Sequence, residues 1–400
     1  MKSATVRLGV DIGGTFTDVV LEKSGETFST KVLTTHAAPE EAIIEGLHRV
    51  CDRAGVLPGE IGQIIHGTTL ATNALIERRG ARTALITTEG FRDVIEMRTE
   101  SRFEQYDLNL TLPEPLLPRQ MRFTVTERVN AGGEVMIALD PAEIEAVADR
   151  IAEAGIESVA VGFIHSYLNP AHERMVRDVL ARRLPQVLVS ISSEVSPQMR
   201  EYERFNTTVA NAYIKPLMSS YLGRLEEKLR AEGTDCRVFL MHSGGGIISV
   251  ANAAEFPVRL VESGPAGGAV FAAHIAARYG LDKVLSFDMG GTTAKICMIN
   301  NQTPKTSRVF EVARTYRFKK GSGMPISIPV IDMVEIGAGG GSLAHVDSLR
   351  QIRVGPESAG SEPGPACYGR GGDRPAVTDA DLVLGKLDAD NFAGGALRLN

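Results

Sequence analysis

The sequence predicts an α/β protein built from two related lobes that share a cleft. Short apolar segments of strand length alternate with segments of helical periodicity, which is typical of α/β architecture. The chain has 400 residues, more than one hydrophobic core usually supports. A motif consisting of an apolar strand, an aspartate, one apolar residue and Gly-Gly-Thr occurs at Asp11 and again at Asp288, 277 residues later (288 − 11). This offset is too long for a solenoid repeat and indicates two related lobes.

The N-terminal elements follow from apolar periodicity and from glycine and proline positions. Residues 6–10 and 16–22 read as strands joined by a glycine turn, and residues 27–34 read as a third strand. Residues 39–54 have one apolar helical face, and Gly55 follows as a stop signal. The remaining predicted elements are strands at 61–65, 83–86, 158–163 and 238–241, and helices at 70–79, 141–154, 170–183 and 196–228, the last bent or divided at Pro216.

The predicted domain division places residues 1–280 in the first lobe and residues 281–400 in the second. The proline-rich segment at about 96–126 interrupts the alternation of strands and helices. We expect it, together with residues 196–235, to form inserted segments that shape a substrate site or an interface.

Composition excludes several functional classes. The formal net charge is −6, the pI is about 5.8, and no basic tract is present, which argues against nucleic-acid binding. The longest apolar segments have strand length, and no apolar signal segment precedes residue 6, so we expect no membrane association and a cytoplasmic location. The four cysteines show no CxxC spacing and the eight histidines no HxxxH pair, which disfavours disulfides and cysteine or helical zinc sites.

The two glycine turns predict a site for phosphate. Paired glycines let the backbone approach a ligand closely and direct successive N–H groups toward one anion. The aspartates, Asp11 and Asp288, suit a position beside phosphate if Mg²⁺ lies between them and the phosphate, usually through water. One of them could instead orient or deprotonate an attacking group. The predicted phosphate-binding residues are Gly13, Gly14, Thr15, Thr17, Gly290, Gly291, Thr292 and Thr293.

A single such motif could be an ordinary hairpin turn, but two copies with matching flanking strands favour a shared site. Further candidates near substrate or nucleotide are His66, Thr68, Thr69 and the glycine-dense Gly339, Gly340 and Gly341. His66 could equally be satisfied by neighbouring backbone groups, and the two threonines could cap the following helix.

Several segments resemble the hydantoinase A family, which includes ATP-dependent 5-oxoprolinase, N-methylhydantoinase, related lactamases, and acetone or acetophenone carboxylase subunits. The segments carrying the resemblance are residues 11–18, 66–75, 90–94, 200–204, 211–213, 288–293, 337–342 and 363–369. The resemblance implies the two-lobed actin and sugar-kinase fold with ribonuclease-H-like lobes, shared with heat-shock chaperone ATPases. It also implies that the two glycine turns are the phosphate loops, and that a helix entered at 262–268 and ending at Tyr279 connects the lobes.

The resemblance also implies an activity, cofactors and a partner. The implied reaction is ATP- and Mg²⁺-dependent opening of a cyclic amide such as a hydantoin, 5-oxoproline or a lactam. The alternatives are a ketone carboxylase subunit and, from another class, a chaperone- or activator-type ATPase. The family implies a hydantoinase B type subunit or domain as partner, and hence a hetero-oligomer. No adenosine-binding glycine motif follows Leu384, so we expect an incomplete second lobe.

Overall fold

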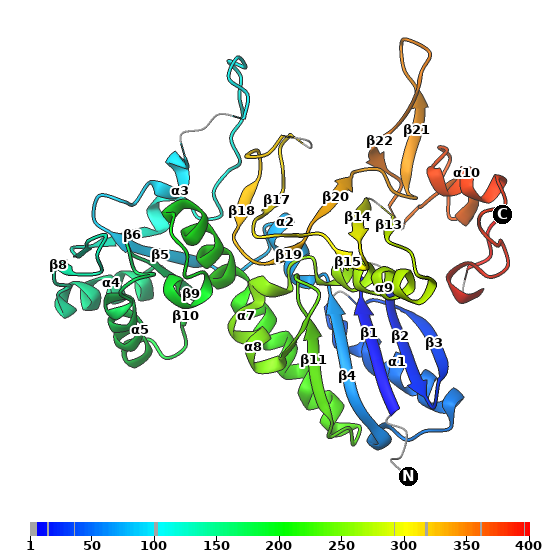
Figure 1. The fold of residues 1–400 in the computed structure, drawn as a ribbon, viewed down its shortest axis with the longest axis horizontal. Helices are drawn as coiled ribbons and strands as arrows, with labels where there is room; N and C mark the ends of the chain where they lie inside the picture. The colour runs from blue at the N-terminus through cyan, green and yellow to red at the C-terminus, as the bar shows by residue number, and fades with distance from the viewer. Residues whose placement is uncertain are drawn as a thin grey trace.

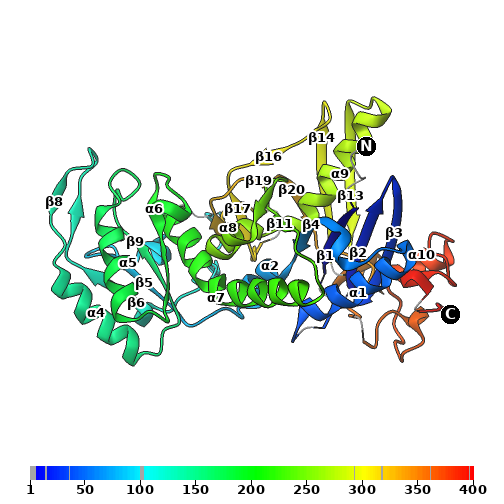
Figure 2. The same cartoon turned by 90° about the horizontal axis from the view of Figure 1, so that it is seen from below.

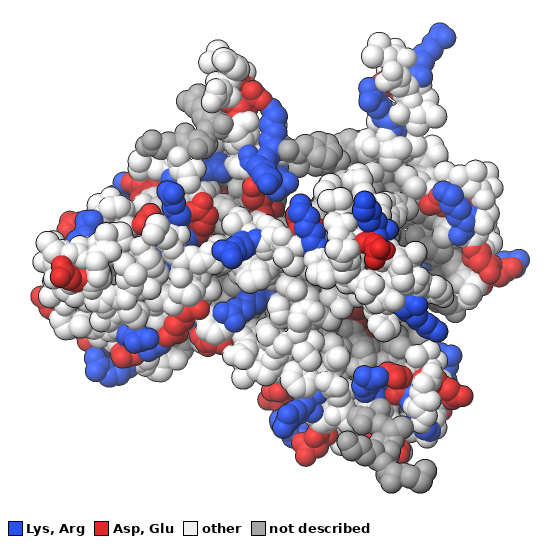
Figure 3. All heavy atoms as spheres, in the orientation of Figure 1, with Lys and Arg blue, Asp and Glu red and all other residues white. Residues whose placement is uncertain are grey.

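The structure is a computed structural model that describes residues 6–13, 16–35, 37–99, 103–291, 293–316, 319–360, 362–395 and 397–400. It contains three main β-sheets with helices packed against them (Figure 1). On the face shown in Figure 3, basic and acidic side chains are interspersed. Over the described residues, no helix combines the length and the apolar composition needed to cross a membrane.

The first sheet has six strands in the order β12-β11-β4-β1-β2-β3. Its central strand β1 is antiparallel to β2 and parallel to β4. Alternate residues of β1 are buried, so one face of the sheet forms the core. That face packs against α1 and the second half of α7. The strands are β1 (Val6–Ile12), β2 (Phe16–Lys23), β3 (Glu26–Leu33), β4 (Ile61–Thr68), β11 (Arg237–Met241) and β12 (Ile247–Ser249), and the helices are α1 (Pro39–Ala54), α2 (Leu70–Ile76) and α7 (Glu201–Ala231).

The second sheet has four parallel strands in the order β10-β9-β5-β6. Helices cover both faces, and every residue of β5 and β9 is buried, as expected for a parallel sheet. Helices α4 and α5 pack on one face and the first half of α7 on the other. The elements are β5 (Thr83–Thr88), β6 (Arg122–Val125), β9 (Ser158–Gly162), β10 (Leu188–Ile191), α4 (Pro141–Glu153) and α5 (Ala171–Arg183).

Helix α7 connects these two sheets. It continues through Pro216 as one helix of 31 residues and is not divided there. Figure 2 shows it extending from the second sheet to α1 beneath the first. Its early residues Phe205, Val209 and Ala212 lie in the core of the second sheet. Its later residues, such as Met218 and Leu225, lie in the core of the first.

The third sheet contains the second copy of the sequence motif. Strand β13 (Lys283–Met289) is antiparallel to β14 (Ala294–Asn300), and β14 also pairs with β15 (Thr303–Pro304) and β20 (Met333–Ile336). Helix α9 (Ser263–Tyr279) packs against β4 and β11 of the first sheet and against β13, β14 and β15 of the third. Its buried face consists of small residues, Ala266, Ala269, Ala273 and Ala276, which allow close approach to both sheets.

The remaining elements are short. The sequence predicts an irregular segment at about 96–126; residues 119–125 instead form a 3₁₀ turn and strand β6 of the second sheet, while most of the described residues from Thr99 to Pro118 are irregular. The remaining short helices and strands are α3 (Val94–Met97), α6 (Ser192–Val195), α8 (Val250–Glu255), α10 (Val377–Val383), β7 (Arg128–Val129), β8 (Val135–Ile137), β16 (Thr306–Ser307), β17 (Phe310–Val312), β18 (Met324–Ile326), β19 (Val330–Ile331), β21 (Ser342–Val346) and β22 (Ile352–Ser358). The described residues also form five 3₁₀ turns, Pro58–Glu60, Arg119–Met121, Pro257–Leu260, Ala366–Tyr368 and Phe392–Gly395.

Candidate functional site

The two glycine motifs fold into hairpins of the same geometry. Asp11 pairs with Asp18 in the first hairpin, and Asp288 pairs with Lys295 at the same register in the second. Each turn closes with one backbone bond of 2.9 Å, from the Gly13 N–H in the first and the Gly290 N–H in the second, to the carbonyl three residues later. The sequence repeat is therefore a structural repeat. The predicted phosphate-binding residues Gly14, Thr15 and Thr292 lie outside the described residues.

The two aspartates lie close enough to interact electrostatically. Asp11 lies on the face of β1 opposite the core residues Val10 and Ile12. Burial, and then the negative charges of Asp18 and Asp288, raise the pKa of the Asp11 carboxyl. The two hairpins thus bring the two carboxylates within electrostatic range of each other, with Asp11 beside the start of α9. Such an arrangement attracts a cation, which would offset the repulsion between the carboxylates.

Two glycines leave room for the Asp11 carboxylate. A Cβ at Gly67 would lie 2.8 Å from Asp11 Oδ1, and one at Gly264 would lie 3.4 Å from it. Gly67 is the residue of β4 that pairs with Asp11, and Gly264 lies in the first turn of α9. Three separate segments therefore shape the space around this carboxylate. Sequence reasoning missed these two glycines because their role depends on contacts between distant segments.

The donor set suits Mg²⁺ held by few protein ligands. Within the part of the chain that the structure describes, no group of three or more His, Cys, Asp or Glu side chains could form a metal cage. Mg²⁺ usually keeps several waters and binds through one or two carboxylates together with phosphate oxygens. Asp11 and Asp288 fit that pattern, with Asp11 in the space left by Gly67 and Gly264.

Thr17 does not reach the cleft, so its prediction as a phosphate ligand is wrong. Its side chain is fully buried, because it is in phase with the core residues Val19 and Leu21 of β2. Its hydroxyl lies 3.0 Å from that of Thr34, which in turn donates to the Gly13 carbonyl at 3.1 Å. Thr17 therefore supports the turn from the core face of the sheet, through Thr34. The second hairpin has Ala294 at the equivalent position.

His66 also points into the core, which corrects its placement near the ligands. His66 lies on β4 and pairs with Val10 of β1, so its side chain lies on the opposite face of the sheet from Asp11. The ring is 1% exposed, and its Nε2 lies 2.7 Å from the hydroxyl of Tyr221 on α7. The geometry favours a structural role for this histidine.

The burial of His66 predicts a pH-dependent stability. Burial lowers the pKa of its imidazole from 6.5 to about 4. The unfolded chain therefore binds more protons than the folded chain between these values, and stability falls as the pH falls through this window. Between pH 7 and pH 5 we expect this group to lower the free energy of unfolding by about 2 kcal/mol.

Urea unfolding of the full-length protein at both pH values measures this effect. His66→Asn should lose this part of the pH dependence, whereas the control His345→Asn, at an exposed position, should keep it. Equal pH dependence in His66→Asn and the unsubstituted protein would contradict the interpretation.

The two neighbouring threonines join the strand end to helix α2 and to α9. Thr68 is buried, and its hydroxyl accepts a 3.2 Å bond from the N–H of Leu70, the first residue of α2; the N-cap residue is Thr69, whose side chain makes no capping bond. Its carbonyl accepts the Ser263 hydroxyl at 3.0 Å. The Thr69 hydroxyl donates to the Ile12 carbonyl at 3.1 Å, at the end of the strand that carries Asp11. Thr69 therefore borders the first hairpin, while the Thr68 side chain faces the core.

The glycine-dense segment supports the second hairpin directly. The N–H of Gly340 donates to Gly290 O at 2.9 Å, and the N–H of Gly341 donates to Gly291 O at 2.7 Å. A Cβ at Gly341 would lie 3.0 Å from that Gly291 oxygen, so a side chain would crowd the turn. Gly339, the preceding residue, donates to the Ser342 hydroxyl at 2.9 Å. The structure thus places this predicted segment beside the predicted phosphate turn.

An ion pair that the sequence reasoning missed links the hairpin to α9. Lys295 of β14 pairs with Glu262, which immediately precedes α9. Glu262 has a φ of 64°, an unusual backbone conformation for a residue other than glycine. Lys295 replaces the aspartate found at the equivalent position of the first motif, Asp18. This lysine, in place of the aspartate of the first motif copy, is the sequence feature from which the ion pair could have been suspected.

Comparisons with known proteins agree with the architecture. The family profile described as "Hydantoinase/oxoprolinase N-terminal region" matches residues 7–184, and the one described as "Hydantoinase/oxoprolinase" matches residues 204–400. Caprolactamase subunit alpha of Pseudomonas jessenii is 37% identical over 100% of this chain and 57% of its own length. The acetophenone carboxylase gamma subunit of Aromatoleum aromaticum is 32% identical over 100% of this chain and 56% of its own.

A solved structure extends this similarity to three dimensions. The crystal structure of the ATP-dependent caprolactamase from Pseudomonas jessenii matches with a TM-score of 0.83 and 36% identity, over 98% of this chain and 57% of that chain. The chain thus spans somewhat more than half the length of the relatives it matches. The predicted two-lobed, actin-like α/β fold is confirmed. Since both profiles, the relatives and the fold agree, the chain belongs to the hydantoinase/oxoprolinase family.

Proposed function

We propose that this protein is a subunit of an ATP-dependent enzyme that phosphorylates a cyclic amide and so prepares it for ring opening. The observation that carries the proposal is the pair of hairpins of equal register, whose aspartates Asp11 and Asp288 lie within electrostatic range of each other. Two such turns suit the β- and γ-phosphates of a nucleotide, held from both sides. Family membership and the similarity to the caprolactamase support the choice of a cyclic amide.

The residues of the cleft suggest how the phosphates are held. Backbone N–H groups of the two turns, including that of Gly291, would face phosphate oxygens, and Asp11 and Asp288 would hold Mg²⁺ through its waters. When bound, Mg²⁺ supplies charge neutralisation for the β- and γ-phosphates. Gly67 and Gly264 fix the position of the Asp11 carboxylate by excluding side chains around it. Because α9 contacts both the first and the third sheet, the ion pair of Lys295 and Glu262 would lie at the boundary of the two proposed lobes.

Phosphorylation overcomes the low reactivity of an amide carbonyl. The amide oxygen forms a bond to the γ-phosphorus, the bond from that phosphorus to the β–γ bridging oxygen breaks, and ADP leaves. The nitrogen lone pair and loss of the N–H proton give an O-phosphorylated imidate, which has a good leaving group on carbon. One water then adds to that carbon and the ring C–N bond breaks, and a second water releases phosphate. We assign the hydrolytic half to a partner of the hydantoinase B type, since the caprolactamase relative is itself a named subunit.

A second candidate is the phosphorylation of a ketone enolate or bicarbonate in a carboxylase. It is supported by the similarity to the acetophenone carboxylase gamma subunit, which is 32% identical over the whole chain. Both candidates use the same phosphate cleft, and the residues that distinguish their substrates lie outside the paired hairpins.

ADP release separates the candidates. We would measure it with the full-length protein and its partner, adding hydantoin, 5-oxoproline, ε-caprolactam, or acetophenone with bicarbonate. The proposal expects release that depends on a cyclic amide. Dependence on acetophenone with bicarbonate would establish the carboxylase instead, and release altered only by a client protein would favour a chaperone-type ATPase.

A further inference from the structure

Lys295 distinguishes the second hairpin from the first. It lies opposite Asp288 in the pairing of β13 with β14, as Asp18 lies opposite Asp11 in the pairing of β1 with β2. Residues that face each other across antiparallel strands point to the same side of the sheet, with Cβ atoms about 4.5–5.5 Å apart. The first hairpin therefore presents two carboxylates on one side, and the second presents a carboxylate and a lysine.

The side of the third sheet that carries Lys295 packs against α9. Lys295 is in phase with Cys297 and Ile299, which are buried together with alanines of α9. The first turn of α9 also borders Asp11, because a Cβ at Gly264 would lie 3.4 Å from Asp11 Oδ1. Helix α9 thus contacts both the sheet of the first hairpin and the sheet of the second (Figure 1).

Glu262, the residue immediately before α9, holds the lysine. The two side chains pair, and only 16% of the Lys295 side chain and 8% of the Glu262 side chain is exposed. The Glu262 N–H donates to the Thr72 hydroxyl at 3.0 Å, and the neighbouring Ser263 hydroxyl donates to the Thr68 carbonyl at 3.0 Å. These bonds attach the acid to α2 and to the end of β4, whereas the lysine belongs to the third sheet.

The net stability of a buried ion pair does not account for a lysine at this position. The cost of removing two charges from water offsets much of their attraction, so replacing both by neutral residues is often neutral or stabilising. A lysine beside a phosphate site has a chemical use, because cationic side chains stabilise the charge of a transferring phosphoryl group. Lys295 lies opposite Asp288 and two residues after Thr293, which the sequence predicts to bind phosphate.

We propose that Lys295 binds a phosphate of the nucleotide, with its ammonium group oriented by Glu262. The inference rests on the proposed function, since it requires a nucleotide between the hairpins. An ammonium group has three donors, so the bond to Glu262 leaves donors for a phosphate oxygen beside the second hairpin. Glu262 positions the lysine and does not itself contact the phosphate, because both are anionic. Lys295 thus adds a protein cation to a site in which Asp11 and Asp288 would hold Mg²⁺.

A double variant tests the lysine while it keeps the net charge of the pair at zero. Lys295→Met with Glu262→Gln replaces both members by neutral side chains of similar size. No buried charge is left unpaired, so the melting temperature should stay close to that of the unsubstituted protein. The matched control is Lys305→Met with Asp332→Asn, which removes an exposed ion pair beside β15 and β20. A third variant, Glu262→Gln alone, retains the lysine.

Isothermal titration calorimetry of the full-length proteins measures binding of the non-hydrolysable β,γ-imido analogue of ATP in the presence of Mg²⁺. The double variant at Lys295 and Glu262 should bind at least about 10-fold more weakly than the unsubstituted protein, because it loses a charge-assisted hydrogen bond to phosphate. The control double variant and Glu262→Gln should both bind within about 3-fold of the unsubstituted protein.

The possible results distinguish this inference from the proposed function. Equal binding by the double variant and the unsubstituted protein would overturn the inference, and so would a loss in Glu262→Gln as large as that in the double variant. A large fall in the melting temperature of the double variant would show that the pair is structural and would also overturn it. Failure of the unsubstituted protein to bind the nucleotide would overturn the proposed function, and this inference with it.

Discussion

Asp11→Asn and Asp288→Asn should each reduce substrate-dependent ADP release at least about 100-fold without unfolding the protein. Asparagine keeps the size of aspartate but loses the negative charge that would hold Mg²⁺ beside the phosphates. Asp11 lies on the face of β1 opposite the core, and its raised pKa reflects partial burial and repulsion by Asp18 and Asp288. Removing one of these charges relieves that repulsion, so neither variant should melt at a markedly lower temperature.

The matched control is Asp52→Asn, which changes an exposed aspartate of α1. Steady-state ADP release and thermal melting would be measured for all three variants in the full-length protein. The assignment of a metal to the two carboxylates is wrong if Asp11→Asn and Asp288→Asn release ADP as fast as Asp52→Asn. Because all three variants carry the same Asp→Asn change, a difference in ADP release between them reflects the position at which the charge is lost.

Gly67→Ala should reduce the same activity about 100-fold although it removes no charged group. The added methyl carbon would lie 2.8 Å from Asp11 Oδ1, closer than a real Cβ contact, so the carboxylate must move. A displacement of about 1 Å in an active site can cost about 100-fold in rate. Steady-state kinetics should show the loss mainly in turnover, because substrate contacts elsewhere are unchanged.

Gly264→Ala provides a graded comparison. Its Cβ would lie 3.4 Å from the same oxygen, within ordinary contact distance, so we expect a loss of less than about 10-fold. Gly223→Ala, in a helix position with no atom near the new Cβ, should leave activity unchanged. Equal activity of Gly67→Ala and Gly264→Ala would contradict a constrained Asp11.

Local patterns in the sequence predicted the paired hairpins correctly. Asp11 and Asp288 each lie near the end of a short apolar strand, directly before the turn. The hairpin geometry is therefore determined by residues that are neighbours in the sequence, so a local pattern can predict it. Strand periodicity also contained information that the site prediction did not use. Thr17 is in phase with Val19, and His66 is in phase with Ile64, so alternation alone assigns both to the core face.

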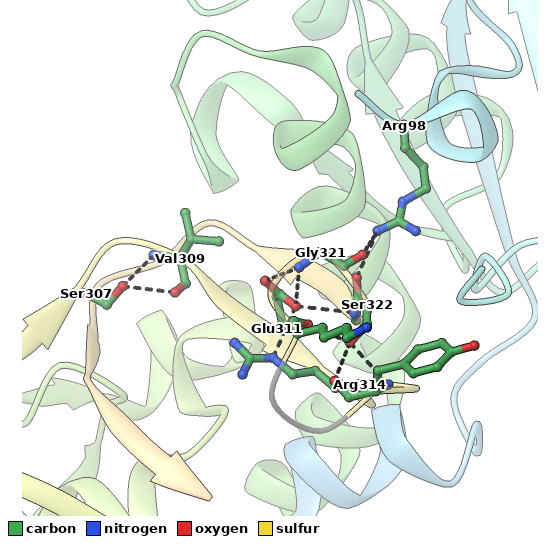
Figure 4. Close-up of polar contacts among 10 residues, drawn as sticks. Arg98, Ser307, Val309, Glu311, Arg314, Gly321 and Ser322 are labelled. Atoms are coloured by element: carbon green, nitrogen blue, oxygen red, sulfur yellow. Dashed lines mark hydrogen bonds and ion pairs between the residues drawn. The ribbon is translucent and has the colours of Figure 1, made fainter. Parts of the chain in front are cut away.

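Long-range pairing could not be predicted in the same way. Strand β5 pairs with β9, and Thr83 lies opposite Ser158, so the second sheet joins residues 75 positions apart (158 − 83). The bonds from Arg98 to the carbonyls of Gly321 and Gly323 likewise join distant segments (Figure 4). No local pattern encodes such contacts, because each segment alone reads as an ordinary loop or helix end.

Helix α7 has a consequence for how the molecule unfolds. Phe205 and Val209 anchor its beginning among the residues of one sheet, and Met218 and Leu225 anchor its end among those of another. Neither sheet can lose its hydrophobic covering without exposing part of a helix that the other still requires. We therefore expect the two sheets to unfold as one cooperative unit, so that a destabilising substitution at either end of this helix destabilises both.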